Sequence, residues 1–165
     1  MTPVAPAPAT PASDGLLALD RQVCFALAVA SRNVIGLYRP LLEPMGLTHP
    51  QYLVMLALWE HSPRSVTELS HALALDPGTL SPLLKRLEAA GHVRRDRVPT
   101  NERMLAITLT DAGRALRAQA ERIPPAVVER LGMSLDELEG LHSVLTGVIA
   151  ATTSDTVRDD DRPMD

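Results

Sequence analysis

The sequence has few aromatic residues, a single cysteine and no long hydrophobic run. Aromatic residues make up 2% of the 165 residues, so the apolar 45% is mostly Leu, Ala and Val, which favours helices over sheets. The single cysteine, Cys24, excludes a disulfide within the chain. No apolar run approaches the roughly 18 residues of a membrane-spanning helix, and the N-terminus has no signal-peptide pattern. We therefore expect a soluble, cytoplasmic protein.

Both ends of the chain are expected to be disordered. Residues 1–13 contain four prolines, and residues 154–165 are rich in aspartate. Neither stretch can bury enough apolar surface to offset the entropy of ordering. The folded part should therefore be a single domain over residues 14–153.

The net charge of -4 argues against indiscriminate binding to nucleic acid, but it hides a local excess of cations. Between Lys85 and Arg103 there are six cations and three anions, a local charge of +3, so the rest of the chain carries -7. A chain with this distribution can repel DNA in general and bind it with one edge.

Several helix starts carry the signal of a capping box. In this box a Ser or Thr and a Gln or Glu three residues later satisfy two free amides reciprocally. The starts with this spacing are Thr48, Ser65 and Ser134. The helices that follow should run to about His61, Leu73 and Thr153.

Two further helices contain prolines that should interrupt them. The first is capped by Asp20 and should kink or pause at Pro40. The other begins after Thr110 or Asp111 and should be interrupted near residues 124–125, which are both proline.

Two short helices joined by a tight link cover residues 65–73 and 76–91. One face of the second helix is apolar, and the opposite face is small and basic. The apolar face consists of Leu80, Leu83, Leu84 and Leu87. A surface without bulky side chains can enter a DNA groove closely, although the same pattern also fits an ordinary amphipathic helix with a solvated face.

The segment that follows decides between these interpretations. Residues 92–97 and 103–109 read as two strands around a turn at 98–102, with basic residues at the tip. Helix, helix and basic hairpin in this order predict a winged helix-turn-helix over about residues 48–109. The predicted fold class is thus mainly α with a small β-hairpin wing, and the predicted activity is binding to double-stranded DNA.

The start of the second helix has two possible geometries. Either Asp76 caps it and Pro77 is its first residue, or Ser81 is the cap and Pro82 comes first. In the first case Pro82 removes one hydrogen bond and crowds the carbonyl of Gly78. We expect an irregular first turn in both cases.

The candidate DNA contacts are polar residues on these elements. Thr79, Ser81, Lys85 and Arg86 are the candidates for the major groove. Arg97 and Arg103 flank the tip of the wing and could enter a minor groove or contact phosphates only. Ser65 could offer its helix N-terminus to a phosphate. The histidines lack metal-ligand spacing and no nucleotide-binding glycine loop is present, so we expect no metal and no cofactor.

Cys24 lies near the start of the first helix, where the helix dipole favours a thiolate. A thiolate attacks a peroxide oxygen and becomes a sulfenic acid. A free cysteine is also often a small buried hydrophobe, and this alternative stays open on local sequence alone.

Four stretches resemble one known family. They are residues 23–27, 37–42, 47–52 and 78–88. They are similar to the organic-hydroperoxide-sensing OhrR branch of the MarR family of winged-helix repressors, and the resemblance covers about residues 16–150.

The resemblance implies a cytoplasmic homodimer that represses transcription and leaves its operator once an organic hydroperoxide oxidises a cysteine. It implies dimerisation through helices at about 14–47 and 110–153. Cys24 matches the sensing cysteine, and Tyr38 matches a tyrosine that hydrogen-bonds its sulfur. His49 stands where the family has a second such tyrosine, and Ala28 replaces a pocket aromatic. The imidazole of His49 could donate to a thiolate, or act on it as a cation.

The spacing of these residues has a consequence for assembly. Cys24 and Tyr38 are 14 residues apart on one predicted helix, or roughly 21 Å, and cannot touch within one chain. If both serve one site, two chains must run antiparallel across a two-fold axis. With no second cysteine, a small thiol, another protein's thiol or over-oxidation must consume the sulfenic acid.

Two other functions remain open. The chain could be a repressor released by a non-covalent organic ligand, with Cys24 incidental. It could also be a cysteine peroxidase, but such an enzyme would need neither a basic helix nor a wing, and a resolving cysteine is lacking.

Overall fold

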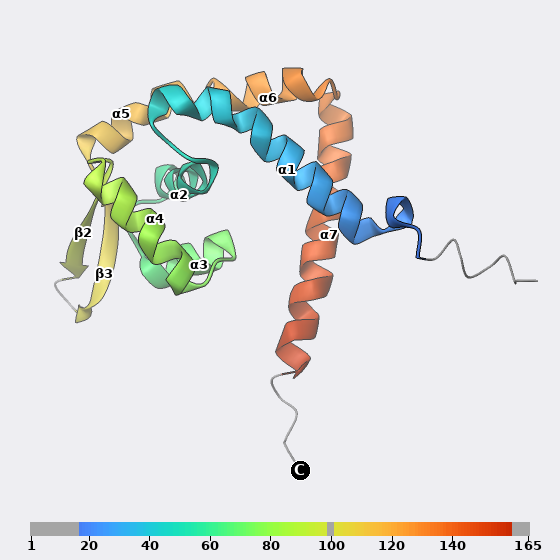
Figure 1. Cartoon of the computed structure of the whole chain (residues 1–165). Coiled ribbons are helices and arrows are strands. Elements are labelled where there is room, and N and C mark those ends of the chain that lie inside the picture. The colour runs from blue at the N-terminus through green and yellow to red at the C-terminus, as the bar shows by residue number, and fades with distance from the viewer. Residues whose placement is uncertain (1–16, 99–100, 160–165) are drawn as a thin grey trace, which may run out of the picture. The chain divides into compact units, whose positions relative to one another are not determined.

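The computed structural model describes residues 17–98 and 101–159 (Figure 1). The arm predicted to be disordered at residues 1–13, residues 160–165 of the acidic tail and the centre of the wing turn lie outside this range. The chain divides into two compact units, which meet between Arg117 and Ala118. The single domain expected over residues 14–153 stays a prediction.

The first unit contains most of the secondary structure. In chain order its elements are η1 (Leu19–Arg21), α1 (Val23–Leu42), η2 (Glu43–Met45), α2 (His49–Glu60), β1 (Arg64–Ser65), α3 (Val66–Leu73), α4 (Pro77–Ala89), β2 (Val93–Val98), β3 (Asn101–Leu109) and the start of α5 (Asp111–Ala120). The winged helix-turn-helix predicted from the sequence is confirmed.

The first helix begins and ends later than expected. Asp20 does not cap α1, because it lies in the 3-10 turn η1, after which the extended Gln22 restarts the helix at Val23. The pause expected at Pro40 is also wrong, since α1 continues to Leu42. Pro40 removes only the bond to the carbonyl of Gly36, an exposed residue at which water can take the place of the missing amide.

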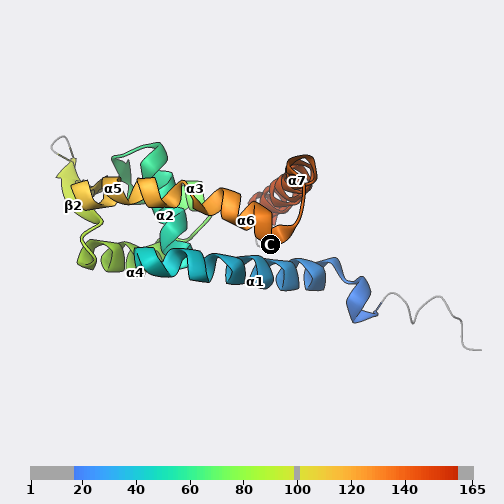
Figure 2. The ribbon, with the colours of Figure 1, turned by 90° about the horizontal axis from the view of Figure 1, so that it is seen from above.

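Only the carboxyl-terminal end of α1 is buried, at Leu42. In both views the amino-terminal part of α1 extends beyond α2, α3 and α4 (Figures 1 and 2). Apolar side chains on this part are exposed, among them Val23 (71%) and Phe25 (38%).

Helix α2 is the central helix of the first unit. Half of its residues are buried: Gln51, Tyr52, Val54, Met55, Ala57 and Leu58. The Oε1 atom of Gln51 accepts from the amide and the hydroxyl of Thr48, at 2.8 and 3.0 Å, which confirms the predicted start. At the start of α3 the amide of Ser65 donates to Glu68 at 2.6 Å and the amide of Glu68 donates to Ser65 Oγ at 3.1 Å, so this box is confirmed as well.

The wing is part of a three-stranded antiparallel sheet of order β1-β3-β2. Arg95 pairs with Ile107 across β2 and β3, and Arg64 pairs with Ile107 across β1 and β3. The predicted hairpin is confirmed, but β1 was not predicted. A strand of two residues has no alternation of side chains by which the sequence could reveal it.

The second unit contains the end of α5, α6 (Ile123–Leu131) and α7 (Leu135–Asp159). The break falls at residues 121–122, just before the two prolines, which occupy the first turn of α6 where their missing amides cost little. Ser134 and Glu137 form the predicted box, with amide bonds of 2.8 and 3.3 Å. Helix α7 ends six residues beyond the expected Thr153.

Helix α7 carries several large apolar side chains on its surface: Leu135, Leu141, Val144, Val148 and Ile149. Even so, none of the helices in the described ranges has the length and apolar character needed to cross a membrane.

Candidate nucleic-acid interface and cysteine site

Helix α4 has one buried face and one exposed face. Its leucines are all buried, and the residues predicted for the major groove, Thr79, Ser81, Lys85 and Arg86, are all exposed. The leucines anchor the helix to α2 and α3. The short polar side chains on the outer face do not project far from the helix backbone. This is the shape that a helix needs to enter a DNA groove.

Asp76 fixes the start of α4. Its carboxylate accepts from the amide and the hydroxyl of Thr79, at 2.9 and 2.6 Å, and these bonds hold the pKa of Asp76 below its usual value. A Cβ on Gly78 would lie 2.9 Å from Asp76 Oδ1, so a side chain there would push the capping carboxylate aside. The late start at Ser81 is therefore wrong.

The expected irregular first turn is also wrong, because α4 is a continuous α-helix from Pro77 to Ala89. Pro82 removes one amide, whose acceptor would be the carbonyl of Gly78. Gly78 is exposed, so solvent can satisfy that carbonyl and the helix tolerates the proline.

The cations near α4 fall into two groups. Arg94 pairs with Asp96 at 2.7 Å and Arg95 pairs with Glu88 at 3.2 Å. Among the described side chains, Lys85, Arg86 and Arg97 make no ion pair. Among the described cations near α4, those without an ion pair thus lie on the exposed face of α4 and near the wing tip.

The other predicted DNA contacts have different placements. Arg97 is exposed on β2, whereas Arg103 lies in β3 with its side chain outside the described residues. Ser65 is only 8% exposed, and both its amide and its hydroxyl are used in the capping box. Because Ser65 is buried and its amide already donates to Glu68, a phosphate at this helix end would use neighbouring amides.

Cys24 is exposed, as the second residue of α1. Tyr38 lies 14 residues further along the same helix, so the two are roughly 21 Å apart. The rings of Tyr38 and His49 are in contact, with centroids 4.9 Å apart. The structure therefore brings two of the three predicted sensing residues together and leaves Cys24 away from both.

Burial changes the titration of the residues around Tyr38. It lowers the pKa of His49 and raises the pKa of Tyr52, whose ring centroid lies 6.0 Å from that of Tyr38. The uncharged form of the His49 imidazole is thus favoured. In that form it can act on a thiolate as a hydrogen-bond donor.

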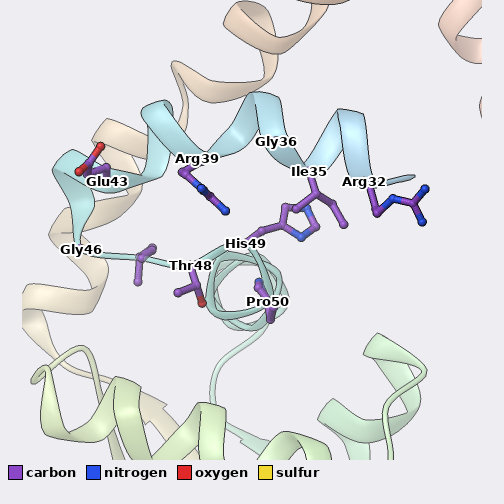
Figure 3. Close-up of a pocket in the computed structure, with 10 residues that line it drawn as sticks. Arg32, Ile35, Gly36, Arg39, Glu43, Gly46, Thr48, His49 and Pro50 are labelled. Atoms are coloured by element: carbon purple, nitrogen blue, oxygen red, sulfur yellow. The ribbon is translucent and has the colours of Figure 1, made fainter. Parts of the chain in front are cut away.

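A pocket of about 570 Å³ lies beside His49, between α1 and the start of α2 (Figure 3). It is lined by Arg32, Ile35, Gly36, Arg39, Glu43, Gly46, Leu47, Thr48, His49 and Pro50. Ile35 and Arg39 point from α1 towards α2 (Figure 3). Sequence reasoning missed Arg32 and Arg39, although their spacing of seven residues places both on one face of a helix.

The family described as "Transcriptional regulator SarA/Rot" matches residues 36–119. Those residues include the whole winged helix and all but the last residue of α5. The chain belongs to the SarA/Rot and MarR type of winged-helix transcriptional regulators. The match does not include Cys24.

Individual relatives of the regulator carry related names. It is 50% identical over 123 residues to the regulator TtmR of Methylorubrum extorquens, a match that covers 74% of this chain and 63% of that protein. It is 40% identical over 127 residues to the organic hydroperoxide resistance transcriptional regulator of Bacillus subtilis, covering 77% of this chain and 86% of that protein. These relatives are named as transcriptional regulators, a class that is not enzymatic.

Solved structures agree with these relationships. The structure of reduced AbfR bound to DNA superimposes with a TM-score of 0.69 at 33% identity, covering 85% of this chain and 98% of that one. AbfR is a protein of Staphylococcus epidermidis.

Proposed function

We propose that this regulator is a cytoplasmic homodimer that represses transcription from operator DNA and releases the DNA after an organic hydroperoxide oxidises Cys24. The observation that carries the proposal is the separation of the sensing residues. Cys24 is exposed at one end of α1, and the Tyr38–His49 pair lies at the other end beside a pocket.

The DNA-binding part of the proposal rests on α4 and the wing. Thr79, Ser81, Lys85 and Arg86 face a major groove, while Arg97 and Arg103 approach the adjacent minor groove or its phosphates. Since Thr79 uses its hydroxyl hydrogen on Asp76, it can only accept from a base. Lys85 and Arg86 make no ion pair within the described chain, so they are available to neutralise phosphates.

The sensing part of the proposal requires two chains. A second copy that runs antiparallel along α1 brings its Cys24 to the pocket beside Tyr38 and His49, and the reverse contact forms at the same time. The exposed Val23 and Phe25 beside Cys24 would then be buried in the interface. Neutral His49 and the hydroxyl of Tyr38 are the donors that a thiolate or a sulfenate needs.

The chemistry is a two-electron transfer from sulfur. The Cys24 thiolate attacks the outer oxygen of the hydroperoxide, an S–O bond forms, the O–O bond breaks and an alcohol leaves. A small thiol can then attack the sulfenic acid, forming a mixed disulfide and releasing water. The added bulk in a tight interface would rotate the subunits and spoil the spacing of two recognition helices about 34 Å apart.

One relative has been solved in more than one oxidation state. AbfR has been solved in a reduced form bound to DNA, an overoxidized form bound to DNA and a form with a disulfide. The relative from Bacillus subtilis is named for resistance to organic hydroperoxides. Both support a redox input for this regulator.

The pocket favours a second candidate. Arg32 and Arg39 lie on a partly apolar wall with Ile35, which suits an organic anion of moderate size. In that case a non-covalent ligand releases the DNA and Cys24 is incidental.

A gel shift on operator DNA separates the two candidates. Wild type and Cys24→Ser are compared with and without cumene hydroperoxide plus a small thiol. We expect both proteins to bind and only wild type to release. Equal release by the two proteins would show that oxidation of Cys24 is not the switch, and steady consumption of hydroperoxide would indicate an enzyme instead.

A further inference from the structure

Three of the four aromatic side chains of the protein form a row along α2. The ring centroids of Tyr38 and Tyr52 are 6.0 Å apart, and those of Tyr52 and Trp59 are 6.3 Å apart. His49 begins α2 and contacts Tyr38, while Trp59 lies near the other end of the same helix. The row therefore joins the Tyr38–His49 pair to the far end of α2, about 15 Å away at 1.5 Å per residue.

At that end Trp59 is bonded to α5. Its indole Nε1 donates to the carbonyl oxygen of Gly113 at 2.9 Å, across 54 residues of sequence. Gly113 is buried in the first turn of α5. This bond fixes the end of α2 to the start of α5.

The start of α5 is in turn fixed to the end of α4. Thr110 Oγ1 donates to the Gly91 carbonyl at 2.6 Å, and the Thr110 amide donates to the His92 carbonyl at 3.1 Å. The Gly113 amide donates to Thr110 Oγ1 at 3.0 Å. A Cβ on Gly113 would lie 2.0 Å from the His92 carbonyl oxygen, so the two backbones are in direct contact and cannot move closer.

Gly91 and His92 also close the end of the recognition helix, directly after its C-cap residue Ala90. The amide of His92 donates to the Leu87 carbonyl at 3.0 Å, and the amide of Gly91 donates to the Glu88 carbonyl at 2.9 Å. Gly91 has a φ of +77°, which permits this closure. A displacement of α5 against His92 therefore acts directly on the last turn of α4.

We propose that Trp59, Thr110 and Gly113 form a junction that positions the recognition helix and passes the state of the Tyr38–His49 pair to it. The three are positioning residues, since none of them lies on the exposed face of α4. A shift at the start of α2 moves Trp59, the bond to Gly113 moves α5, and the tight contact with His92 moves the end of α4. The coupling of this junction to the state of the Tyr38–His49 pair rests on the proposed redox function.

Trp59→Phe tests the coupling, because it keeps an aromatic ring and removes the N–H donor. The experiment measures operator affinity by fluorescence anisotropy, before and after cumene hydroperoxide plus a small thiol. For wild type we expect oxidation to weaken binding by a factor of about 5 to 150, the usual range of coupling between two sites. For Trp59→Phe we expect the ratio of reduced-state to oxidised-state affinity to be near 1, with each affinity measured on the variant itself.

Thr110→Val tests the positioning, with Thr110→Ser as its matched control. Valine has the shape of threonine without the hydroxyl, and serine keeps the hydroxyl. We expect Thr110→Val to weaken reduced-state DNA binding by about two- to tenfold, the equivalent of one net hydrogen bond, and Thr110→Ser to bind like wild type. Circular dichroism at the assay temperature confirms that each variant is folded.

The outcomes separate this proposal from the proposed function. Failure of wild type to release DNA on oxidation would overturn the redox function and, with it, the coupling. Release by both wild type and Trp59→Phe would leave the redox function standing and overturn the coupling alone. Equal affinities for Thr110→Val and Thr110→Ser would overturn the positioning role.

Discussion

The winged helix and the amino-terminal part of α1 bury their apolar side chains to very different degrees. Leu80, Leu84 and Leu87 of α4 are at most 1% exposed, whereas Val23, Phe25 and Leu27 of α1 are between 37% and 71% exposed. The apolar core of the winged helix is thus buried within one chain. The apolar side chains around Cys24 stay exposed unless another surface packs on them. This difference fits a division in which DNA is read by each subunit and the oxidant is sensed by a pair.

The largest expected effect is the loss of a core leucine from α4. Leu84→Ala should lower the free energy of unfolding by about 2–5 kcal/mol, because it leaves a cavity where a fully buried side chain was. Urea denaturation at a fixed protein concentration measures the change. Leu56→Ala, at a position 40% exposed, is the matched control and should cost clearly less. A similar loss of unfolding free energy in the two variants would contradict the difference between buried and exposed positions.

Phe25→Ala should act on assembly rather than on folding. Burying a large apolar side chain contributes about 1.5–3 kcal/mol, so the dissociation constant of the proposed dimer should rise about tenfold or more in the variant. Sedimentation equilibrium measures the dissociation constant, and the helical signal of the dissociated chain should persist. A dimer of unchanged affinity would show that this part of α1 is not the interface.

Removal of a cation on α4 that has no ion pair should weaken binding to all DNA sequences by a similar factor. Lys85→Ala is expected to lower the slope of log affinity against log salt by about 1, as for the loss of one phosphate contact. Arg94→Ala is the control, because Arg94 is already paired with Asp96. If the control changes the slope as much as Lys85→Ala does, the unpaired charge on α4 has no special role.

Acid should weaken the helix caps. Hydrogen bonds from the amide and hydroxyl partners lower the pKa of Asp76, Glu68 and Glu137 in the folded chain. The unfolded chain then binds more protons, so this stability is present above the ordinary values near 4 and is lost as the pH falls through the lowered folded values. The melting temperature should decline over that window, with a shallower decline for Glu68→Gln. An equal slope in the variant would show that this cap does not contribute.

His49 adds a second, separate window. Because burial lowers its folded pKa, its neutral form is favoured by folding, and the associated stability is present above about 6.5 and lost as the pH falls below it. His49→Gln should remove this part of the pH dependence. A melting profile between pH 7 and pH 5 that is the same for both proteins would argue against it.

The features that sequence reasoning found are those that nearby residues determine. The boxes at Thr48, Ser65 and Ser134 each involve residues three positions apart, and all three occur in the structure. The expectations at Pro40 and Pro82 were wrong because a proline removes a single hydrogen bond, and the exposed carbonyl that loses it can bond to water instead. Helices α1 and α4 therefore pass over Pro40 and Pro82.

The candidate site was only partly predictable for a related reason. The contact between Tyr38 and His49 depends on how α1 folds back on α2, and the bond from Trp59 to Gly113 joins residues 54 positions apart. A pattern within a short stretch of sequence does not predict contacts between residues so far apart along the chain. The position of Cys24 relative to the other two could be inferred only because a helix has a fixed rise per residue.

The bond between Trp59 and Gly113 has a practical consequence. Trp59 is the only tryptophan in the sequence, and its indole N–H is committed to one backbone carbonyl beside a buried glycine. The emission of an indole responds to the polarity around it and to what its N–H meets. The protein thus contains its own optical probe at the place where α2 meets α5, and oxidation or DNA binding can be followed there in real time without any attached dye.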